Sequence, residues 1–143
     1  PHGIIIDNRK TAPELYVADR ANSRVQVYDL NGEFIRSFGS QFLNTPSGFS
    51  VYQDLMVVAE LDSKLTILDK DDQFIEYLFM DEEAPNRPGW PNEEKNDSAL
   101  KRPSDLKPGK FNSPHGMTID RDGNIYVAEW LIGGRMTKLK KIN

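Results

Sequence analysis

The sequence predicts an all-β fold made of β-propeller blades, and three observations lead to this prediction. The chain of 143 residues contains three related phrases, at 1–39, 46–79 and 113–143. Each phrase has Pro-x-Gly, a short apolar run, a turn and then "YVAD", "VVAE" or "YVAE". Within each phrase apolar and polar residues alternate, and β-branched residues are frequent, which is typical of strands. Four short antiparallel strands repeated about every 40 residues are the signature of a propeller blade.

The first blade is predicted at 1–39 and the second at 46–79. The runs "RVQVYDL" and "KLTILDK" both alternate with a period of two, as strands with one buried face do. The pair Asn31-Gly32 separates the first of these runs from "EFIRSF", and Asn-Gly is the strongest short signal for a β-hairpin. A simple β-meander also alternates and uses such turns, but shared Pro, Gly, Ala and acidic positions in three copies favour propeller blades.

The third blade is predicted at 113–143 and is incomplete. The pair Asp122-Gly123 marks a hairpin between "MTID" and "IYVAE", and no counterpart to "EFIRSFG" follows the next alternating run. Because propellers have at least about four blades, three blades are too few to close a ring. The sequence therefore predicts half of a ring. Since the first residue is Pro1 and not Met, we expect the chain to be a piece of a longer protein.

Residues 80–112 interrupt the repeat between the second and third blades. They contain many prolines and charged residues, and nothing in them alternates. A loop of this length in a compact domain is usually functional or disordered. Within it, "RPGWP" combines Pro88, Trp90 and Pro91 into a stiff apolar group. Two interpretations remain open: a loop packed on the blade edges, or a lid over the mouth of the central channel with Trp90 as a wall.

The composition argues against several classes of function. The chain has no cysteine, so disulfide bonds and thiolate metal sites are excluded. Its net charge of −4 argues against a nucleic-acid or membrane-surface binder, because both of those partners favour a strong positive field. No apolar run is long enough to span a bilayer. The compartment is left open, and a secreted or periplasmic location would require a signal peptide in the parent protein.

Both histidines of the chain, His2 and His115, lie in a "PHG" phrase at the same position of the first and third blades. Residues at equivalent positions of the innermost strands converge on the central channel, so we expect the two imidazoles to face each other. Converging imidazoles suggest a divalent transition metal, with zinc preferred. The second blade has Ser47 there, which is a poor zinc ligand, so a third ligand would come from outside this chain. Alternatively, "PHG" is a turn in which histidine caps backbone carbonyls.

The phrases "LYVADRANSRVQVYDLNGEFIRSFG" and "SPHGMTIDRDGNIYVAEW" resemble NHL repeats, which form the blades of six-bladed propellers. This resemblance implies an NHL-type fold in which the chain supplies three of six blades. A narrower resemblance is to peptidyl-α-hydroxyglycine α-amidating lyases, whose zinc ligands are histidines in Pro-His phrases. His2 and His115 match two of these ligands, and Arg20 in "YVADR" matches an arginine of the family's active site. The chain would then correspond to the last three blades.

The narrower resemblance implies a metal-dependent carbon–nitrogen lyase that cleaves a peptidyl-α-hydroxyglycine into an amide and glyoxylate. Zinc would act as a Lewis acid on the hydroxyl or carboxylate of the substrate, and Arg20 would hold the carboxylate or stabilise negative charge. Trp130 occupies the place that Arg20 has in the first blade. Trp90 and Trp130 are candidate walls of the substrate channel.

Departures from the family limit this expectation. The family's tyrosine base, its third histidine and a further arginine would lie before Pro1. We therefore expect the isolated chain to be inactive, because a site needs its whole set of residues. Animal members carry an acid bound to a structural calcium after the last Pro-His, and here that residue is Gly116. This difference argues against calcium.

The alternative function is a non-enzymatic NHL propeller that binds a protein or a ligand, in place of a small peptide-like substrate. The lysines and arginine of "GRMTKLKKIN" are interpreted as the solvated face of a terminal strand, so nucleic acid is not expected as a partner. Unpaired sheet edges are templates for another chain. We therefore expect a homodimer in which two three-bladed halves close a six-bladed ring.

The predicted core consists of apolar residues on the expected strands, mostly at every second position. These residues are Ile4, Ile6, Leu15, Val17, Val25, Val27, Phe34, Ile35, Val57, Leu65, Ile67, Ile75, Ile119, Ile125, Val127 and Leu139. Neighbours such as Phe34 and Ile35 cannot face the same side of a strand, so we expect some of the residues in this set not to be buried.

Overall fold

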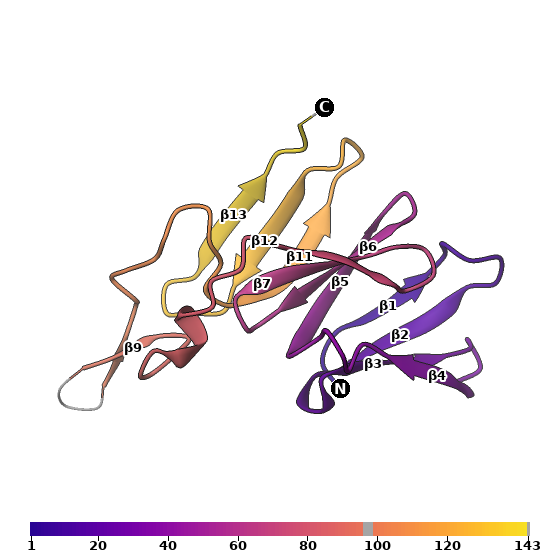
Figure 1. Ribbon diagram of the computed structural model, residues 1–143, viewed down its shortest axis with the longest axis horizontal. Coiled ribbons are helices and arrows are strands. Elements are labelled where there is room, and N and C mark those ends of the chain that lie inside the picture. The colour runs from indigo at the N-terminus through magenta and orange to yellow at the C-terminus, as the bar shows by residue number, and fades with distance from the viewer. Residues whose placement is uncertain (96–98, 143) are drawn as a thin grey trace.

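The structure, a computed structural model, describes residues 1–95 and 99–142. The described strands form three larger antiparallel sheets, which we name blades 1, 2 and 3 in chain order (Figure 1), and one two-stranded sheet of β9 (Glu93–Glu94) and β10 (Leu100–Lys101). Blade 1 contains β1 (Ile4–Asp7), β2 (Glu14–Asp19), β3 (Arg24–Tyr28) and β4 (Phe34–Phe38). Blade 2 contains β5 (Pro46–Tyr52), β6 (Leu55–Glu60), β7 (Lys64–Leu68) and β8 (Phe74–Leu78). Blade 3 contains β11 (Pro114–Ile119), β12 (Ile125–Glu129) and β13 (Arg135–Leu139).

Each blade is an up-and-down sheet whose strands pair in chain order, and the first strands β1, β5 and β11 lie next to one another. Blades 1 and 2 have four strands, and blade 3 has three within the part of the chain that the structure describes. The predicted fold class, an all-β arrangement of propeller blades, is confirmed. A short 3-10 turn, η1 (Arg20–Asn22), joins β2 to β3.

The tight turns between strands use one recurring device. The carboxylates of Asp29, Asp69 and Asp120 each accept two backbone N–H groups from the turn that follows. Three residues further on, the backbone has a positive φ in every case, at Gly32, Asp72 and Gly123. Glycine adopts this conformation without a steric penalty, so the two predicted hairpins at Asn31-Gly32 and Asp122-Gly123 follow from their sequence. Asp72 is the exception, held by contacts described below.

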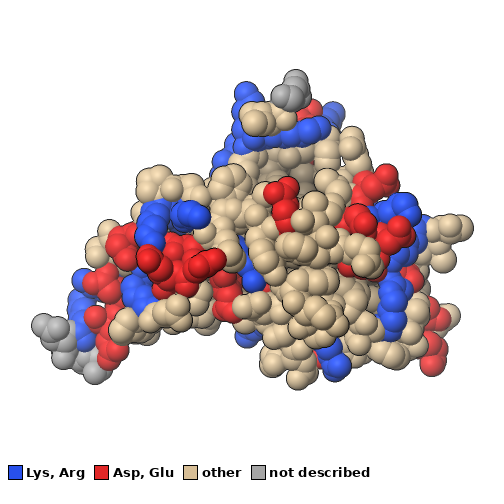
Figure 2. All heavy atoms as spheres, viewed as in Figure 1, with Lys and Arg blue, Asp and Glu red and all other residues tan. Residues whose placement is uncertain are grey.

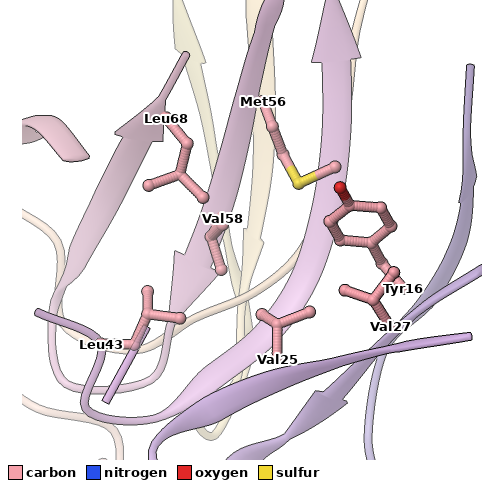
Figure 3. Close-up of a cluster of buried hydrophobic side chains, with 7 residues drawn as sticks. All are labelled: Tyr16, Val25, Val27, Leu43, Met56, Val58 and Leu68. Carbon is pink, nitrogen blue, oxygen red and sulfur yellow. The ribbon is translucent and has the colours of Figure 1, made fainter. Parts of the chain in front are cut away.

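Two apolar clusters lie between the blades. The first joins blades 1 and 2 and contains Tyr16, Val25, Val27, Leu43, Met56, Val58 and Leu68 (Figure 3). The second joins blades 2 and 3 and contains Val57, Ala59, Leu65, Ile67, Phe111 and Val127. Side chains alternate between the faces of a strand, so β6 sends neighbouring residues into different clusters. Its run "LMVVAE" is therefore apolar at nearly every position.

The predicted core list is partly confirmed and partly wrong. Val25, Val27, Val57, Leu65, Ile67 and Val127 are buried, and Leu15, Val17, Ile119, Ile125 and Leu139 are half-buried. Ile4, Ile6, Phe34, Ile35 and Ile75 are exposed, contrary to the prediction. Ile4 and Ile6 alternate with Ile5, which packs on the first cluster, so they lie on the face of blade 1 that turns away from blade 2. Ile35 and Ile75 stand at register shifts of their sheets.

The segment between blades 2 and 3 carries η2 (Ala84–Asn86) and the short strands β9 (Glu93–Glu94) and β10 (Leu100–Lys101). Its end packs into the fold, because Phe111 is buried in the second cluster and its N–H bonds to the carbonyl of Phe79. The part that carries β9 projects as a lobe from the molecule (Figure 1). Charged side chains gather on this lobe, whereas much of the surface in the middle of the same view is uncharged (Figure 2).

Candidate functional site

The Pro-x-Gly phrases begin the three innermost strands, and their backbones approach one another closely. A Cβ atom added at Gly3 would lie 2.4 Å from the Ser47 carbonyl oxygen, and one at Gly48 would lie 2.8 Å from the His115 carbonyl oxygen. Real Cβ atoms do not come this near to other heavy atoms. Glycine is therefore required at both positions by the next blade, and the middle residue of each phrase is brought to the same end of the three blades.

His2 and His115 lie against each other at this end. Their ring centroids are 4.6 Å apart and the ring planes make an angle of 83°. Nδ1 of His2 lies 2.9 Å from the carbonyl oxygen of Ser47. Because a carbonyl only accepts, Nδ1 must carry the hydrogen, and the lone pair of a neutral His2 ring is then on Nε2. The structure thus brings the two imidazoles together, while their role in metal binding stays a prediction.

The surroundings of His115 favour its neutral form. Burial lowers the pKa of His115 from its ordinary value, and the nearby His2 and Arg20 lower it further. Only a neutral imidazole offers a lone pair to a metal ion. At neutral pH this ring is therefore in the state that a metal ligand requires.

Arg20 is the first residue of η1, at the end of β2. It is half-buried, and its charge reaches His115. Among the residues that the structure describes, Arg20 takes part in no ion pair. The end of the blades that holds the histidines therefore also offers a guanidinium without an ion-pair partner among the described residues, which suits a carboxylate.

The two predicted tryptophans lie in different surroundings. The Trp130 side chain is 57% exposed and its ring centroid is 6.1 Å from that of His115. Its backbone is fixed by Ser113, whose carbonyl accepts the Trp130 N–H at 2.9 Å. Trp90 donates its ring N–H to the Asn112 carbonyl at 2.9 Å, and none of the described ring contacts joins it to a histidine. The structure thus groups Trp130 with His2 and His115 but not Trp90.

The acid that ends the second strand of each blade is engaged by the fold. Asp19, Glu60 and Glu129 pair with the basic residues that open the third strands, Arg24, Lys64 and Arg135. The N···O distances are 2.8, 3.8 and 2.7 Å. Glu60 and Glu129 also accept backbone N–H groups of the segments that lead into their blades. Sequence reasoning noticed the recurring acidic position but missed that it pairs with the basic residue that opens the third strand.

These carboxylates do not complete a metal site. Within the described ranges, no group of three or more His, Asp or Glu residues could hold a metal ion. The described residues thus bring two imidazoles together without a third side chain beside them that could complete a group of three ligands. Gly116 has no side chain, so the position where the resembling family has its acid offers no carboxylate here, and the expectation about calcium stays a prediction.

Comparison with known proteins gives a distant likeness in structure. No protein-family model matches this chain, and no curated protein matches it. A solved structure described as streptogramin B lyase is similar, with 10% sequence identity and a TM-score of 0.48. The similar region covers 96% of this chain and 53% of that one, so this chain spans about half its length. A likeness of this size carries no information on activity, and the NHL and amidating-lyase assignments stay predictions.

Within the described residues, no helix has the length and the apolar character that crossing a bilayer requires.

Proposed function

We propose that this chain supplies two histidine ligands of a zinc site at the inner end of a propeller, together with an arginine that holds an anionic substrate. The observation that carries the proposal is the contact between His2 and His115, with ring centroids 4.6 Å apart. The two residues come from blades that are separated by a third, and only the packing of the inner strands brings them together.

The local chemistry supports zinc as the ligand. Metal-binding histidines usually donate their second ring N–H to a carbonyl or a carboxylate, which fixes the tautomer and the orientation of the ring. His2 has this arrangement, since Nδ1 is bonded to the Ser47 carbonyl. The lowered pKa of His115, caused first by burial and then by His2 and Arg20, keeps the second ring neutral. Zinc bound there would polarise a substrate oxygen as a Lewis acid.

The proposed substrate class is a peptide ending in α-hydroxyglycine, or a small molecule with the same groups. Its carboxylate would bind the guanidinium of Arg20, and the exposed face of Trp130 would pack against its apolar part. Transfer of the hydroxyl proton to a base, cleavage of the C–N bond and return of a proton to the departing amide nitrogen would then release an amide and glyoxylate. The base that removes the proton would come from outside this chain, so the proposed activity belongs to a complete propeller.

Zinc titration of the purified chain by calorimetry tests the proposal. We expect His2→Ala and His115→Ala each to weaken zinc binding at least about tenfold, because each removes one ligand. Arg20→Ala should leave zinc affinity unchanged and weaken the binding of glyoxylate to the zinc-loaded chain.

Arg121→Ala is the matched control, because Arg121 is an exposed cation in the turn between β11 and β12, away from the phrases that hold the histidines. Zinc binding that survives both histidine substitutions would contradict the proposed site. Equal effects of Arg20→Ala and Arg121→Ala on glyoxylate binding would contradict the role of Arg20.

A further inference from the structure

The loop that carries Trp130 is the longest of the three loops that join the second and third strands of a blade. It contains residues 130–134, whereas the corresponding loops of blades 1 and 2 contain residues 20–23 and 61–63. Its last two residues are glycines with positive φ. Because glycine has more backbone freedom than any other residue, this loop needs contacts from elsewhere to keep one conformation.

The lobe between blades 2 and 3 supplies such contacts. The Ile132 N–H donates to Oδ1 of Asn92 at 2.7 Å. Nη1 of Arg102 donates to the carbonyl oxygen of Ile132, at 3.2 Å, and to that of Gly134. A Cβ atom added at Gly133 would lie 3.2 Å from the same Nη1. The guanidinium thus lies against the two glycines, and the loop is bonded to the lobe on both sides of Gly133.

The hairpin of β9 and β10 brings these two anchors to the same place. Glu93 pairs with Lys101 in its register, and Asn92 and Arg102 are the next residues along the two strands. Both anchors therefore reach one residue of the loop, Ile132, from the base of the hairpin.

Trp130 lies at the start of the anchored loop. Its N–H donates to the Ser113 carbonyl at 2.9 Å, and its own carbonyl accepts the Ser113 hydroxyl at 2.8 Å. Its ring centroid is 6.1 Å from that of His115. The backbone of Trp130 is thus held by the segment that leads to His115, and the path of the chain after it is held two residues later by the lobe.

We propose that Asn92 and Arg102 are positioning residues that hold Trp130 against the apolar part of the substrate. They would thereby select substrates that carry an apolar group next to the α-hydroxyglycine, an inference that rests on the proposed function of the site. Among the described residues, no hydrogen bond or ion pair joins Asn92 or Arg102 to either histidine. The lobe therefore has a role in the choice of substrate and none in the chemical step.

Calorimetry on the zinc-loaded chain with two probes tests this inference. N-benzoylglycine carries a carboxylate, an amide and an apolar ring, whereas glyoxylate has no apolar part. Trp130→Ala should weaken the binding of N-benzoylglycine about threefold to tenfold, because an aromatic contact is lost. Arg102→Ala and Asn92→Ala should each weaken it at least about twofold, with a smaller effect on glyoxylate.

The double variant Arg102→Ala with Trp130→Ala distinguishes positioning from an independent role. Its loss should not exceed that of Trp130→Ala alone, because Arg102 acts only through Trp130. Lys101→Ala is the matched control, since this neighbouring cation pairs with Glu93 inside the lobe at 2.7 Å, and it should bind N-benzoylglycine as the wild type does. Equal losses for both probes in Arg102→Ala, or losses that add in the double variant, would overturn the inference.

Amide hydrogen exchange in the zinc-free chain, followed by NMR, separates this inference from the proposed zinc site. The Ile132 N–H should exchange at least about tenfold faster in Asn92→Ala than in the wild type, because its acceptor is removed. Arg102→Ala should accelerate the same exchange. Unchanged exchange in both variants would show that the lobe does not hold the loop. A wild-type chain that binds no zinc would instead contradict the proposed function, on which the substrate part of this inference rests.

Discussion

The two interfaces between blades perform the same task with different chemistry. Both contain an apolar cluster. The interface of blades 1 and 2 adds a group of ionic and polar side chains, namely Asp7, Arg9, Lys10, Glu14, Tyr16, Arg36 and Asp72. Among the described residues, no ion pair joins a strand of blade 2 to a strand of blade 3. One repeat thus yields one interface that depends on charge and one that does not.

Asp72 is the centre of the ionic group. Its carboxylate lies within 2.9 Å of Arg9, Lys10 and Arg36 on blade 1, and Tyr16 donates its hydroxyl to it at 2.9 Å. Burial raises the pKa of Tyr16, and the adjacent Asp72 raises it further, so the hydroxyl keeps its proton and remains a donor. The comparison shows that a buried charged interface requires every partner to be present, whereas an apolar one depends on volume.

Removing the central carboxylate gives the largest expected effect. Asp72→Ala should lower the free energy of unfolding by about 3–5 kcal/mol, because it leaves three cations with only the carboxylates of Asp7 and Glu14 as partners, at a site that is 5% exposed. Urea unfolding measures this loss. Asp72→Asn is the control for the positive φ of 64°, which asparagine tolerates. A loss below about 1 kcal/mol for the alanine variant would mean that the ionic group does not hold the blades together.

The apolar interface should respond to volume instead. Leu65 is fully buried in the second cluster, and Leu65→Ala should lower the free energy of unfolding by about 3 kcal/mol through the cavity that it leaves. The size of this loss should not change between pH 7 and about pH 3, because no ionisable group belongs to that cluster. Urea unfolding of the variant and the wild type at both pH values gives the comparison, and a loss that varies with pH would contradict it.

Acid should weaken the ionic interface of blades 1 and 2 but not the apolar interface of blades 2 and 3. The resulting change in the free energy of unfolding is the smallest of the expected effects. Hydrogen bonds from Arg36 first, with the charges of Lys10 and Arg36, outweigh burial and lower the pKa of Glu14 to about 2. A carboxyl whose pKa is lower in the folded than in the unfolded chain stabilises the fold above the unfolded pKa of 4.5. This stabilisation is lost as the pH falls toward 2. The loss is on the order of 1 kcal/mol because solvent screens the pair.

Glu14→Gln provides the check on that prediction. Unfolding free energies measured from pH 6 to 2 should fall less steeply for this variant than for the wild type. Parallel curves would show that other carboxyl groups account for the acid sensitivity.

The strands were predictable because their signals are local. Alternation, Asn31-Gly32 and Asp122-Gly123 determine where the chain extends and turns. The choice of buried face was not predictable in "IIID", since Ile4, Ile5 and Ile6 are chemically equal. These three residues differ only in whether a neighbouring blade packs on their side of the strand. The residues around them in the sequence do not show on which side that blade lies. For the same reason, the contact of Arg9 with Asp72, which lie 63 positions apart, could not be predicted from the local sequence pattern.

The candidate site was predictable to the extent that it repeats. His2 and His115 share a repeat position, so their meeting could be inferred from the period of the chain. Arg20 required a family resemblance, because a single arginine after "VAD" is unremarkable on its own. Trp130 was placed near the site by its repeat position, whereas Trp90 lies in a segment outside the repeat and its surroundings could not be derived.

In the Pro-x-Gly contact, the packing of neighbouring blades and the chemistry of the middle side chain depend on different groups. Neighbouring blades are fitted together by a glycine and a backbone carbonyl, and every amino acid possesses that carbonyl. The side chain of the middle residue is therefore free to differ, as histidine, serine and histidine do here. A point mutation in the gene can exchange one channel-facing group without refitting the blades, so the lining of such a channel can change one blade at a time.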